Sequence, residues 1–436
     1  MFAYYLQLGL RSLRRNPALT ALMVIAIGAG VATSMTSYSI FRAVSGNPIP
    51  QKSSQLFVVQ VDNYGPQKND NGEPPQEIDY TDAMALFRAQ KAPRQTVLYP
   101  ALLSLLPGEP GATPIRPAGY AVYADAFSMF EIPFLYGGPW SASDDQNRAT
   151  VAVIGRELNE RLFHGANSIG RQVRLNGHDY TITGVIDTWN PTPRYFDPIS
   201  SGPFGDAIEV FIPMSRAVDQ QLITRGNTNC PGENYGNGWD AFLRSGCTWL
   251  LYWVELPSTA DAAAYRQYLH GYAQDQQRAG RFGWAPNVRL RNVSQWLDYQ
   301  RVIPPETTLS LYVSLGFLLI CLVNTVGLLL AKFMRRASEI SVRRALGASR
   351  RDIHAQFLVE GGAVGLAGGL LGVLLTGVGV WSIDLLFDPQ IARLATLDVS
   401  LVAWTVGAAV LAAVLASFYP TWRAAQIQPA WQLKSN

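Results

Sequence analysis

Four stretches of this sequence contain no Asp, Glu, Lys or Arg, and no other feature limits its fold as strongly. They are residues 18–41, 307–331, 361–383 and 399–422. Each exceeds the roughly 20 residues that an α-helix needs to cross about 30 Å of hydrocarbon. The first is longer than the apolar part of a signal peptide, and no clear small-x-small cleavage site follows it. The sequence therefore predicts four transmembrane helices rather than four buried core helices.

The positive charges predict the orientation of these helices. They gather before the first stretch, between the second and third, and after the fourth: Arg11, Arg14, Arg15, Lys332, Arg335, Arg336, Arg343, Arg344, Arg350, Arg351, Arg423 and Lys434. By the positive-inside rule, both termini and residues 332–352 are expected in the cytoplasm, and residues 43–306 outside it.

The predicted organisation is that of a multi-pass membrane protein with one large insertion. Leu6, Leu10 and Leu13 recur at helical spacing and indicate an amphipathic helix on the inner leaflet. The expected segments are this cytoplasmic helix at 1–17, transmembrane helices at 18–42, 307–331, 353–383 and 399–422, an extracytoplasmic domain at 43–306, a cytoplasmic segment at 332–352, a short external loop at 384–398, and a cytoplasmic tail at 423–436.

The extracytoplasmic domain has a mixed α+β pattern. Residues 56–61, 150–154 and 250–256 are β-rich, whereas 157–163 and 262–279 are helical in character. Apolar and polar residues alternate over 172–186 on both sides of Asn176-Gly177, which indicates a hairpin. Residues 188–247 are rich in Gly, Pro, Asn and aromatic residues and are expected to be mostly loop. We expect two lobes in this domain.

The cysteines divide between the predicted compartments. Cys321 falls in the second transmembrane stretch, where a small buried apolar residue is the ordinary role. Cys230 and Cys247 both fall in the extracytoplasmic domain, where an oxidising environment makes a disulfide plausible. Two free thiols are the alternative.

The segment between the second and third transmembrane helices contains specific helix-end patterns. Glu339 and Arg343 are spaced to pair on one helix, and Gly347 suits the left-handed position that ends it. Ser349 and Asp352 have the spacing of a capping box, which predicts that a new helix begins there. We therefore expect two short helical ends that meet at a defined angle.

The third transmembrane stretch contains Gly361, Gly365 and Gly369 at the spacing that lets two helices approach closely. These residues are candidates for helix packing, either within one subunit or between two subunits.

No pattern for catalysis or metal binding stands out. A phosphate-binding loop needs G-x-x-x-x-G-K-[ST], and residues 46–53 approach it only with Gln51 in place of the second glycine. The four histidines have no ligand spacing, and no G-x-S-x-G sequence occurs. We expect no catalytic residue, metal or cofactor on this chain.

Several segments together carry a family resemblance. Residues 324–353, 356–360 and 419–429 closely resemble FtsX-like permeases, and residues 150–163, 168–170 and 174–177 resemble the periplasmic domain of MacB proteins. The resemblance covers most of the chain outside 188–247. It implies the permease subunit of an ABC transporter, a dimer that couples ATP hydrolysis to movement of its periplasmic domains and expels a substrate from the periplasm or the membrane.

The resemblance also implies partners and contact residues. The expected partners are two copies of a separate ABC ATPase carrying ATP and Mg²⁺, a second permease that is either an identical copy or a related chain, and a membrane-fusion protein with an outer-membrane channel. The lipid bilayer is that of the bacterial cytoplasmic (inner) membrane, and nucleic acid is not a partner. The ATPase-coupling residues would be Glu339, Arg343, Arg344, Ala345, Leu346, Gly347, Ala348 and Ser349. Substrate or adaptor contacts are expected in 43–306, with Trp189, Tyr195, Phe196, Tyr235 and Trp239 as candidates. An FtsX-like mechanotransmitter, a lipoprotein-releasing permease and an ATPase-independent receptor are the alternatives.

Overall fold

In a computed structural model, the chain forms two compact units, and the description covers residues 17–68, 70–107, 113–232, 236–336, 339–340, 342–343, 346–386 and 399–425. One unit, which we call the helical bundle, comprises the segments Met1–Ser45 and Ile303–Asn436. The other, the inserted domain, comprises Gly46–Val302. The predicted amphipathic helix at 1–17 and most of the 384–398 and 423–436 segments lie outside the described residues.

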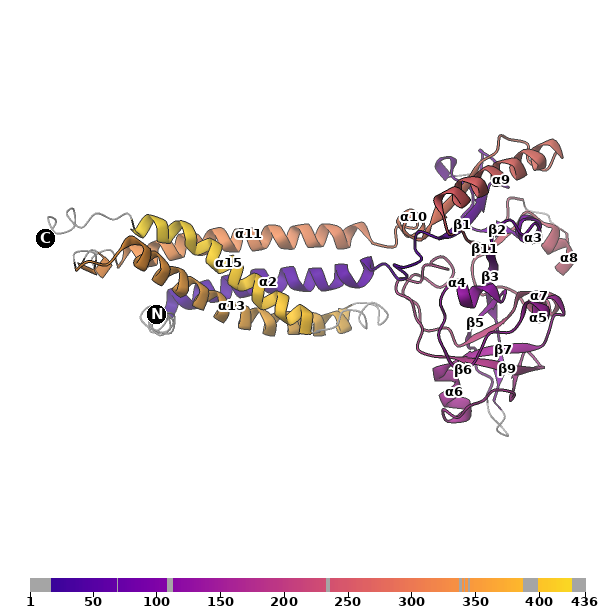
Figure 1. The fold of residues 1–436 in the computed structure, drawn as a ribbon, viewed down its shortest axis with the longest axis horizontal. Coiled ribbons are helices and arrows are strands. Elements are labelled where there is room, and N and C mark those ends of the chain that lie inside the picture. Colours follow the sequence, from indigo (N-terminus) through magenta and orange to yellow (C-terminus); the bar gives the residue numbers. More distant parts are fainter. Residues whose placement is uncertain are drawn as a thin grey trace. The chain divides into compact units, whose positions relative to one another are not determined.

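The helical bundle contains the four helices that the apolar stretches predict (Figure 1). They are α2 (Pro17–Ser45), α11 (Pro305–Met334), α13 (Arg350–Leu386) and α15 (Val399–Ala425). Among the described residues, these are the helices long and apolar enough to cross a membrane. The predicted fold class, four transmembrane helices with a large α+β domain between the first and second, is confirmed.

Small residues bring the helices of the bundle together. A Cβ atom added to Gly361 would lie 2.6 Å from the Cβ atom of Ser417 on α15, and one added to Gly365 would lie 2.6 Å from the Cβ atom of Ala413. Gly369 faces Ala409 in the same way, at 3.2 Å. The predicted glycine row therefore packs against α15 of its own subunit, where only a hydrogen leaves enough room.

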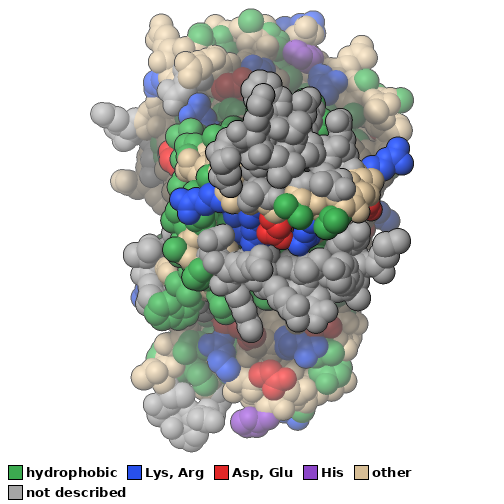
Figure 2. Space-filling model, turned by 90° about the vertical axis from the view of Figure 1, so that its left-hand side faces the viewer, with side chains coloured by type: hydrophobic (Ala, Val, Ile, Leu, Met, Phe, Trp, Pro, Cys, Tyr) green, Lys and Arg blue, Asp and Glu red, His purple; other side chains and the backbone are tan. Residues whose placement is uncertain are grey.

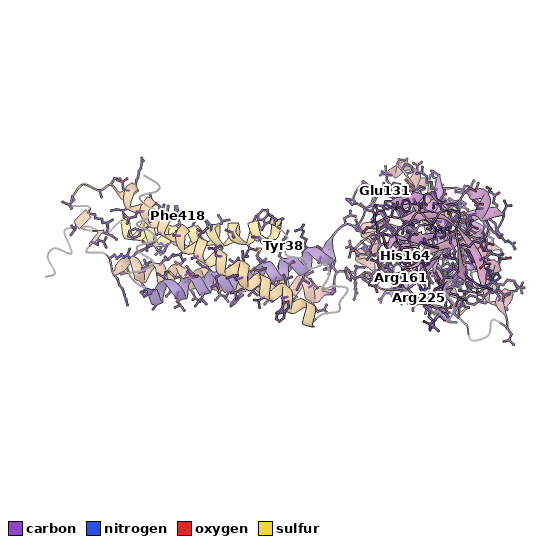
Figure 3. The ribbon with its side chains drawn as sticks, turned by 90° about the horizontal axis from the view of Figure 1, so that it is seen from below. Tyr38, Glu131, Arg161, His164, Arg225 and Phe418 are labelled. Carbon is purple, nitrogen blue, oxygen red and sulfur yellow. A yellow bond between two sulfur atoms is a disulfide. The ribbon has the colours of Figure 1, made fainter. Side chains whose placement is uncertain are left out.

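The outer surface of the bundle is apolar. Tyr38 of α2 and Phe418 of α15, which are labelled in Figure 3, are 39% and 59% exposed. On α11, Leu309 and Tyr312 are more than half exposed. A surface of this kind suits lipid, because apolar side chains in contact with hydrocarbon carry no hydration cost.

The inserted domain is built on one mixed sheet with 12 described strands. The strands are β1 (Leu56–Val61), β2 (Ile78–Asp79), β3 (Arg94–Leu102), β4 (Leu105–Leu106), β5 (Ala118–Val122), β6 (Phe134–Gly137), β7 (Val151–Gly155), β8 (Gln172–Leu175), β9 (His178–Ile186), β10 (Val210–Pro213), β11 (Thr248–Glu255) and β12 (Val288–Asn292). Their order is β12-β1-β11-β3-β5-β10-β7-β9-β8-β4, with β2 paired to β11 and β6 to β9. The sheet is continuous through the domain, and the expected division into two lobes stays a prediction.

Helices pack around this sheet (Figure 1). They are η1 (Asp70–Gly72), α3 (Tyr80–Arg88), α4 (Asp125–Met129), α5 (Ala142–Gln146), α6 (Arg156–Phe163), α7 (Met214–Asp219), α8 (Trp239–Arg244), α9 (Thr259–Arg278) and α10 (Val293–Tyr299). The segment 188–247, predicted to be mostly loop, contributes β10, α7 and α8. β10 pairs with both β5 and β7, so this segment completes the sheet.

Other local predictions are confirmed by the backbone. β8 and β9 form the predicted antiparallel hairpin, and Asn176 and Gly177 both have the positive φ angles, 48° and 83°, that a tight hairpin turn requires. The strand at 56–61 and the helix at 157–163 are also present. The first and last strands, β1 and β12, pair antiparallel from Phe57–Asn292 to Val61–Val288.

Two hydrophobic clusters stabilise the inserted domain. One includes Tyr99, Trp249 and Tyr252, and the other includes Phe130 and Trp253 together with residues of the 188–247 segment. Cys230 and Cys247 form a disulfide in the structure, across 17 positions of the sequence. This bond joins the long connection after β10 directly to the start of β11.

Candidate coupling site

The connection between α11 and α13 is a capped corner, which we define as the described residues of 335–353. Gly347 has a φ of 101°, and the Ala348 N–H donates to the Arg343 carbonyl over 3.1 Å. This bond closes a left-handed helix end of the Schellman type. Immediately afterwards, Ser349 and Asp352 exchange the two hydrogen bonds of a capping box, each 3.2 Å long. The chain thus ends one helix and starts another within about three residues.

Side chains also join the two arms of the corner. Arg343 Nη2 lies 2.6 Å from Glu339 Oε1 on the same arm, and its Nη1 donates to Gln356 Oε1 of α13 over 3.0 Å. Both members of the ion pair are about two-fifths exposed. A pair this exposed stabilises the fold by at most about 1 kcal/mol. Its main effect is therefore to orient Arg343, because one guanidinium contacts both arms.

A buried ionic cluster lies next to the corner. Glu360 of α13 is 1% exposed, with one carboxylate oxygen 2.6 Å from Lys332 Nζ and the other 3.3 Å from an Arg336 Nη. The Lys332 side chain is fully buried. Charges taken out of water this completely need partners, since an unpaired one costs several kcal/mol. The cluster therefore ties the end of α11 to α13.

Apolar contacts complete the corner. Phe333 and Phe357 pack with ring centroids 4.3 Å apart, and Ile340 and Ile353 are buried in the same cluster. Leu346, in contrast, is 83% exposed at the turn itself. Figure 2 views this end of the bundle, where Lys and Arg side chains lie beside Asp and Glu among apolar ones. The corner thus presents an exposed leucine on a backbone held from both sides.

The predicted site residues differ in how the structure uses them. Glu339, Arg343, Gly347 and Ser349 make the contacts given above, Ala348 packs against the apolar cluster of the bundle, and Leu346 faces outward. Arg344 and Ala345 lie outside the described residues.

The aromatic candidates of the inserted domain are mostly interior. Tyr195 and Phe196 are 1% and 2% exposed and belong to the second hydrophobic cluster, so they cannot touch a partner as predicted. Trp189 stacks on Phe196 with centroids 5.3 Å apart. Trp239 is half-buried on α8, and Tyr235 lies outside the described residues. Trp239 packs against the first cluster, with its ring 6.2 Å from that of Trp249, so the described aromatic candidates of 188–247 all contribute to core packing.

Lys332, Arg336 and Glu360 are the residues that the sequence analysis missed. Glu360 borders the uncharged stretch that starts at Gly361, and it is the sole acid within the described bounds of α13 between Asp352 and Ile383. Lys332 and Arg336 have i,i+4 spacing, which places both on one face. An isolated acid at the edge of a span, with two cations spaced this way beside the preceding span, is the pattern that could have indicated the cluster.

Comparisons with known proteins match both units. Residues 20–272 match the family model of the MacB-like periplasmic core domain, and residues 311–429 match that of the FtsX-like permease C-terminal domain. The macrolide export ATP-binding/permease protein MacB of Azoarcus sp. (strain BH72) is 26% identical over 98% of this chain and 58% of its own length. The pyoverdine export ATP-binding/permease protein PvdT of Pseudomonas savastanoi pv. phaseolicola is 26% identical over 71% of this chain and 41% of its own.

The chain thus spans about half the length of these relatives. Among solved structures, the periplasmic region of MacB from Actinobacillus actinomycetemcomitans aligns with 58% of this chain and 95% of its own, at 11% identity and a TM-score of 0.37.

Proposed function

Because the chain belongs to the family of ABC transporter permeases with a MacB-like periplasmic core domain and an FtsX-like permease domain, we propose that it is the permease subunit of an ATP-driven export complex. ATP hydrolysis by a separate subunit moves the bundle, and the bundle moves the inserted domain, which expels a small molecule from the periplasm or membrane. The names of the relatives, macrolide and pyoverdine exporters, support a small molecule as cargo. The same names, ATP-binding/permease proteins, support an ATP-binding part that works together with this permease.

The proposal assigns a side to each part of the chain. Both termini and the corner face the cytoplasm of a bacterial inner membrane, and the inserted domain faces the periplasm. Two ATPase copies dock on two permease copies, each at one corner. A membrane-fusion protein and an outer-membrane channel would continue the export route.

The observation that carries the proposal is the exposure of Leu346 on a corner that is otherwise fixed. A helix end without caps or side-chain anchors would bend under load, whereas this one is held by Gly347, Ser349 and Arg343. Leu346 is 83% exposed at the turn, which leaves its side chain available to a partner. A push on Leu346 would reach α13 and, through Glu360, α11.

Cross-linking tests this docking point. A Leu346→Cys variant in a Cys321→Ser background should form a cross-link with the nucleotide-binding subunit when both are co-expressed and purified in nanodiscs. Leu374→Cys is the matched control, because Leu374 is also an exposed leucine, at 69%, but lies within the membrane-spanning part of α13. A corner that does not contact the nucleotide-binding subunit would give equally little cross-linking at both positions.

Activity measurements separate docking from topology. Glu339→Ala and Arg343→Ala should leave insertion into the membrane unchanged, yet reduce ATPase binding or leave hydrolysis uncoupled from export. Wild-type export by both variants, at equal membrane levels, would mean that these charges serve only to orient the helices.

A further inference from the structure

The inserted domain contains a cavity of about 690 Å³ that the proposed coupling does not use. It lies where the parallel strands β5 and β10 end, and α3, α5, α7 and α8 supply its walls. A space beyond the carboxyl ends of neighbouring parallel strands is a common position for ligands. The volume is within the range of small-molecule sites, which is about 300 to 1,000 Å³.

One part of the lining is flat and apolar. Phe87 of α3 and Tyr123 after β5 stack with centroids 4.0 Å apart and planes 22° from parallel. Met84, whose sulfur accepts a 3.6 Å hydrogen bond from the Tyr123 hydroxyl, continues this surface. Trp239 and Leu243 of α8 also line the cavity. A flat apolar ligand would find stacking area here.

The carboxylates of the lining are already engaged, with one exception at the rim. Asp219 is bound at 2.7 and 2.9 Å by Arg148 and Arg216. Asp145 accepts from the Ala124 N–H and the Trp140 indole, and Asp125 accepts from the Gln95 N–H.

Asp240, the remaining acid, is exposed. Asp219 and Asp145 thus each have two partners, whereas Asp125 accepts a single hydrogen bond.

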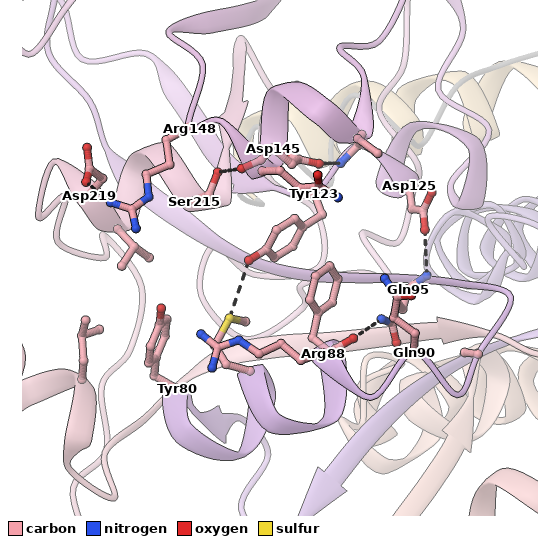
Figure 4. A pocket seen from close by; sticks show the side chains of 18 of the residues that line it. Tyr80, Arg88, Gln90, Gln95, Tyr123, Asp125, Asp145, Arg148, Ser215 and Asp219 are labelled. Atoms are coloured by element: carbon pink, nitrogen blue, oxygen red, sulfur yellow. Dashed lines mark hydrogen bonds and ion pairs between the residues drawn. The ribbon is translucent and has the colours of Figure 1, made fainter.

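Two donors, in contrast, are unused. Among the described residues, the Arg88 guanidinium makes no ion pair and the Tyr80 hydroxyl no hydrogen bond. Both project from α3 toward the space that Arg148 and Ser215 border from the other side (Figure 4). Burial raises the pKa of Tyr80, so its hydroxyl remains a donor at neutral pH. A cation and a neutral donor at one end of an aromatic surface suit a carboxylate on an aromatic body.

We propose that this cavity binds an amphipathic carboxylate, with the acid group on Arg88 and Tyr80 and the flat apolar body against Phe87 and Tyr123. This proposal depends on the proposed export function in one respect only, which is that the bound ligand would be the exported molecule. Binding itself needs no ATPase, so the two proposals can fail separately.

Three related probes test the chemistry on the full chain in nanodiscs. They are N-dansyl-phenylalanine, its neutral carboxamide, and the cation dansylcadaverine, each followed by fluorescence polarisation. The carboxylate should bind saturably and about tenfold more tightly than the carboxamide, since a charge-assisted hydrogen bond is lost in the latter. Equal affinities, tighter binding of the cation, or no saturable binding of the carboxylate would overturn the proposal.

Variants locate the binding within the cavity. Arg88→Gln should remove the preference for the carboxylate, and Tyr80→Phe should reduce it, whereas Arg266→Gln, an exposed arginine on α9, should leave it unchanged. Ala142→Trp places a large side chain on the lining from an exposed position and should weaken both the acid and the amide. Because Arg88 and Ala142 are exposed, these changes should preserve folding, which the unfolding temperature checks. Unchanged carboxylate binding in Arg88→Gln or Ala142→Trp would place the ligand elsewhere.

Discussion

In the helical bundle one buried carboxylate lies between two cations, whereas in the inserted domain two buried carboxylates share one cation. Glu360 contacts Lys332 and Arg336 in the first case. In the second, Asp79 and Asp82 are 1% and 0% exposed and both contact Arg281, at 3.4 and 2.6 Å. The difference matters when a partner is lost. A surplus carboxylate can take up a proton, whereas Arg336, without its carboxylate, cannot release one.

Loss of Glu360 should therefore have the largest effect. Glu360→Ala leaves Lys332 and Arg336 without their carboxylate and should destabilise the bundle by about 3–5 kcal/mol. Hydrogen–deuterium exchange of α11 and α13 peptides in the full-length protein would report it. The double variant Lys332→Met/Glu360→Leu should recover much of the loss, and a double variant as unstable as the single one would contradict the ionic explanation.

Removal of the disulfide should come next. The bond closes a loop of 17 positions, which the chain-entropy model values at roughly 3 kcal/mol. Cys230→Ser/Cys247→Ser should therefore increase exchange around β11 while leaving the bundle unchanged. Peptide mapping without reductant checks the bond itself, since two free thiols in protein from an oxidising compartment would refute it.

Loss of Arg281 should be milder and dependent on pH. Arg281 is 35% exposed, so Arg281→Met should cost less than a fully buried cation, about 2 kcal/mol near pH 8. The cost should fall toward pH 5, because burial and the neighbouring Asp82 already raise the pKa of Asp79 and favour its protonated form. The free energy of unfolding, measured for both proteins at pH 8 and pH 5, tests this. An equal loss of stability at both pH values would mean that protonation of Asp79 does not compensate for the missing arginine.

Steric substitution in the bundle should cost about as much. Gly365→Ala places a Cβ atom 2.6 Å from Ala413 and should destabilise by about 1–2 kcal/mol. Gly316→Ala on α11 is the matched control, because no atom lies within 4 Å of its added Cβ. That change should be neutral or slightly stabilising, since alanine favours helix. Thermal unfolding of the Gly365→Ala and Gly316→Ala variants in the same detergent would show whether close packing or helix propensity has the larger effect on stability.

The last effect, the smallest when it is expressed per pH unit, concerns Glu77 of the inserted domain. Burial, with a further contribution from Asp197, raises the pKa of Glu77 to about 9. The folded state thus holds a proton that the unfolded chain releases above about pH 4.5, and the domain should lose at most about 1.4 kcal/mol per pH unit from there to pH 9. Glu77→Gln should flatten that slope. A slope unchanged in the variant would show that other groups cause it.

The sequence predicts the bundle and the corner well because their determinants are local. Uncharged length identifies a span, Gly347 supplies a backbone conformation that other residues avoid, and Ser349 with Asp352 forms a cap from four adjacent residues. The sheet and the buried clusters depend on long-range pairing instead. β10 joins strands from residues 118–122 and 151–155, and Glu360 meets a lysine 28 positions away. The loop-like composition of 188–247 therefore did not indicate that this segment contains a central strand. No local sequence pattern indicates that Arg88 and Tyr80 lack hydrogen-bond partners.

The pairing of β1 with β12 gives the inserted domain a modular character. The strand that begins the domain and the strand that ends it are hydrogen-bonded neighbours, with Phe57 opposite Asn292 near the points of entry and exit. A domain with adjacent ends can close its own sheet without help from the chain that carries it. Insertions of this type are also the ones that host proteins tolerate best. The same four helices could therefore carry a domain of another size or specificity, exchanged as a cassette between residues 45 and 303.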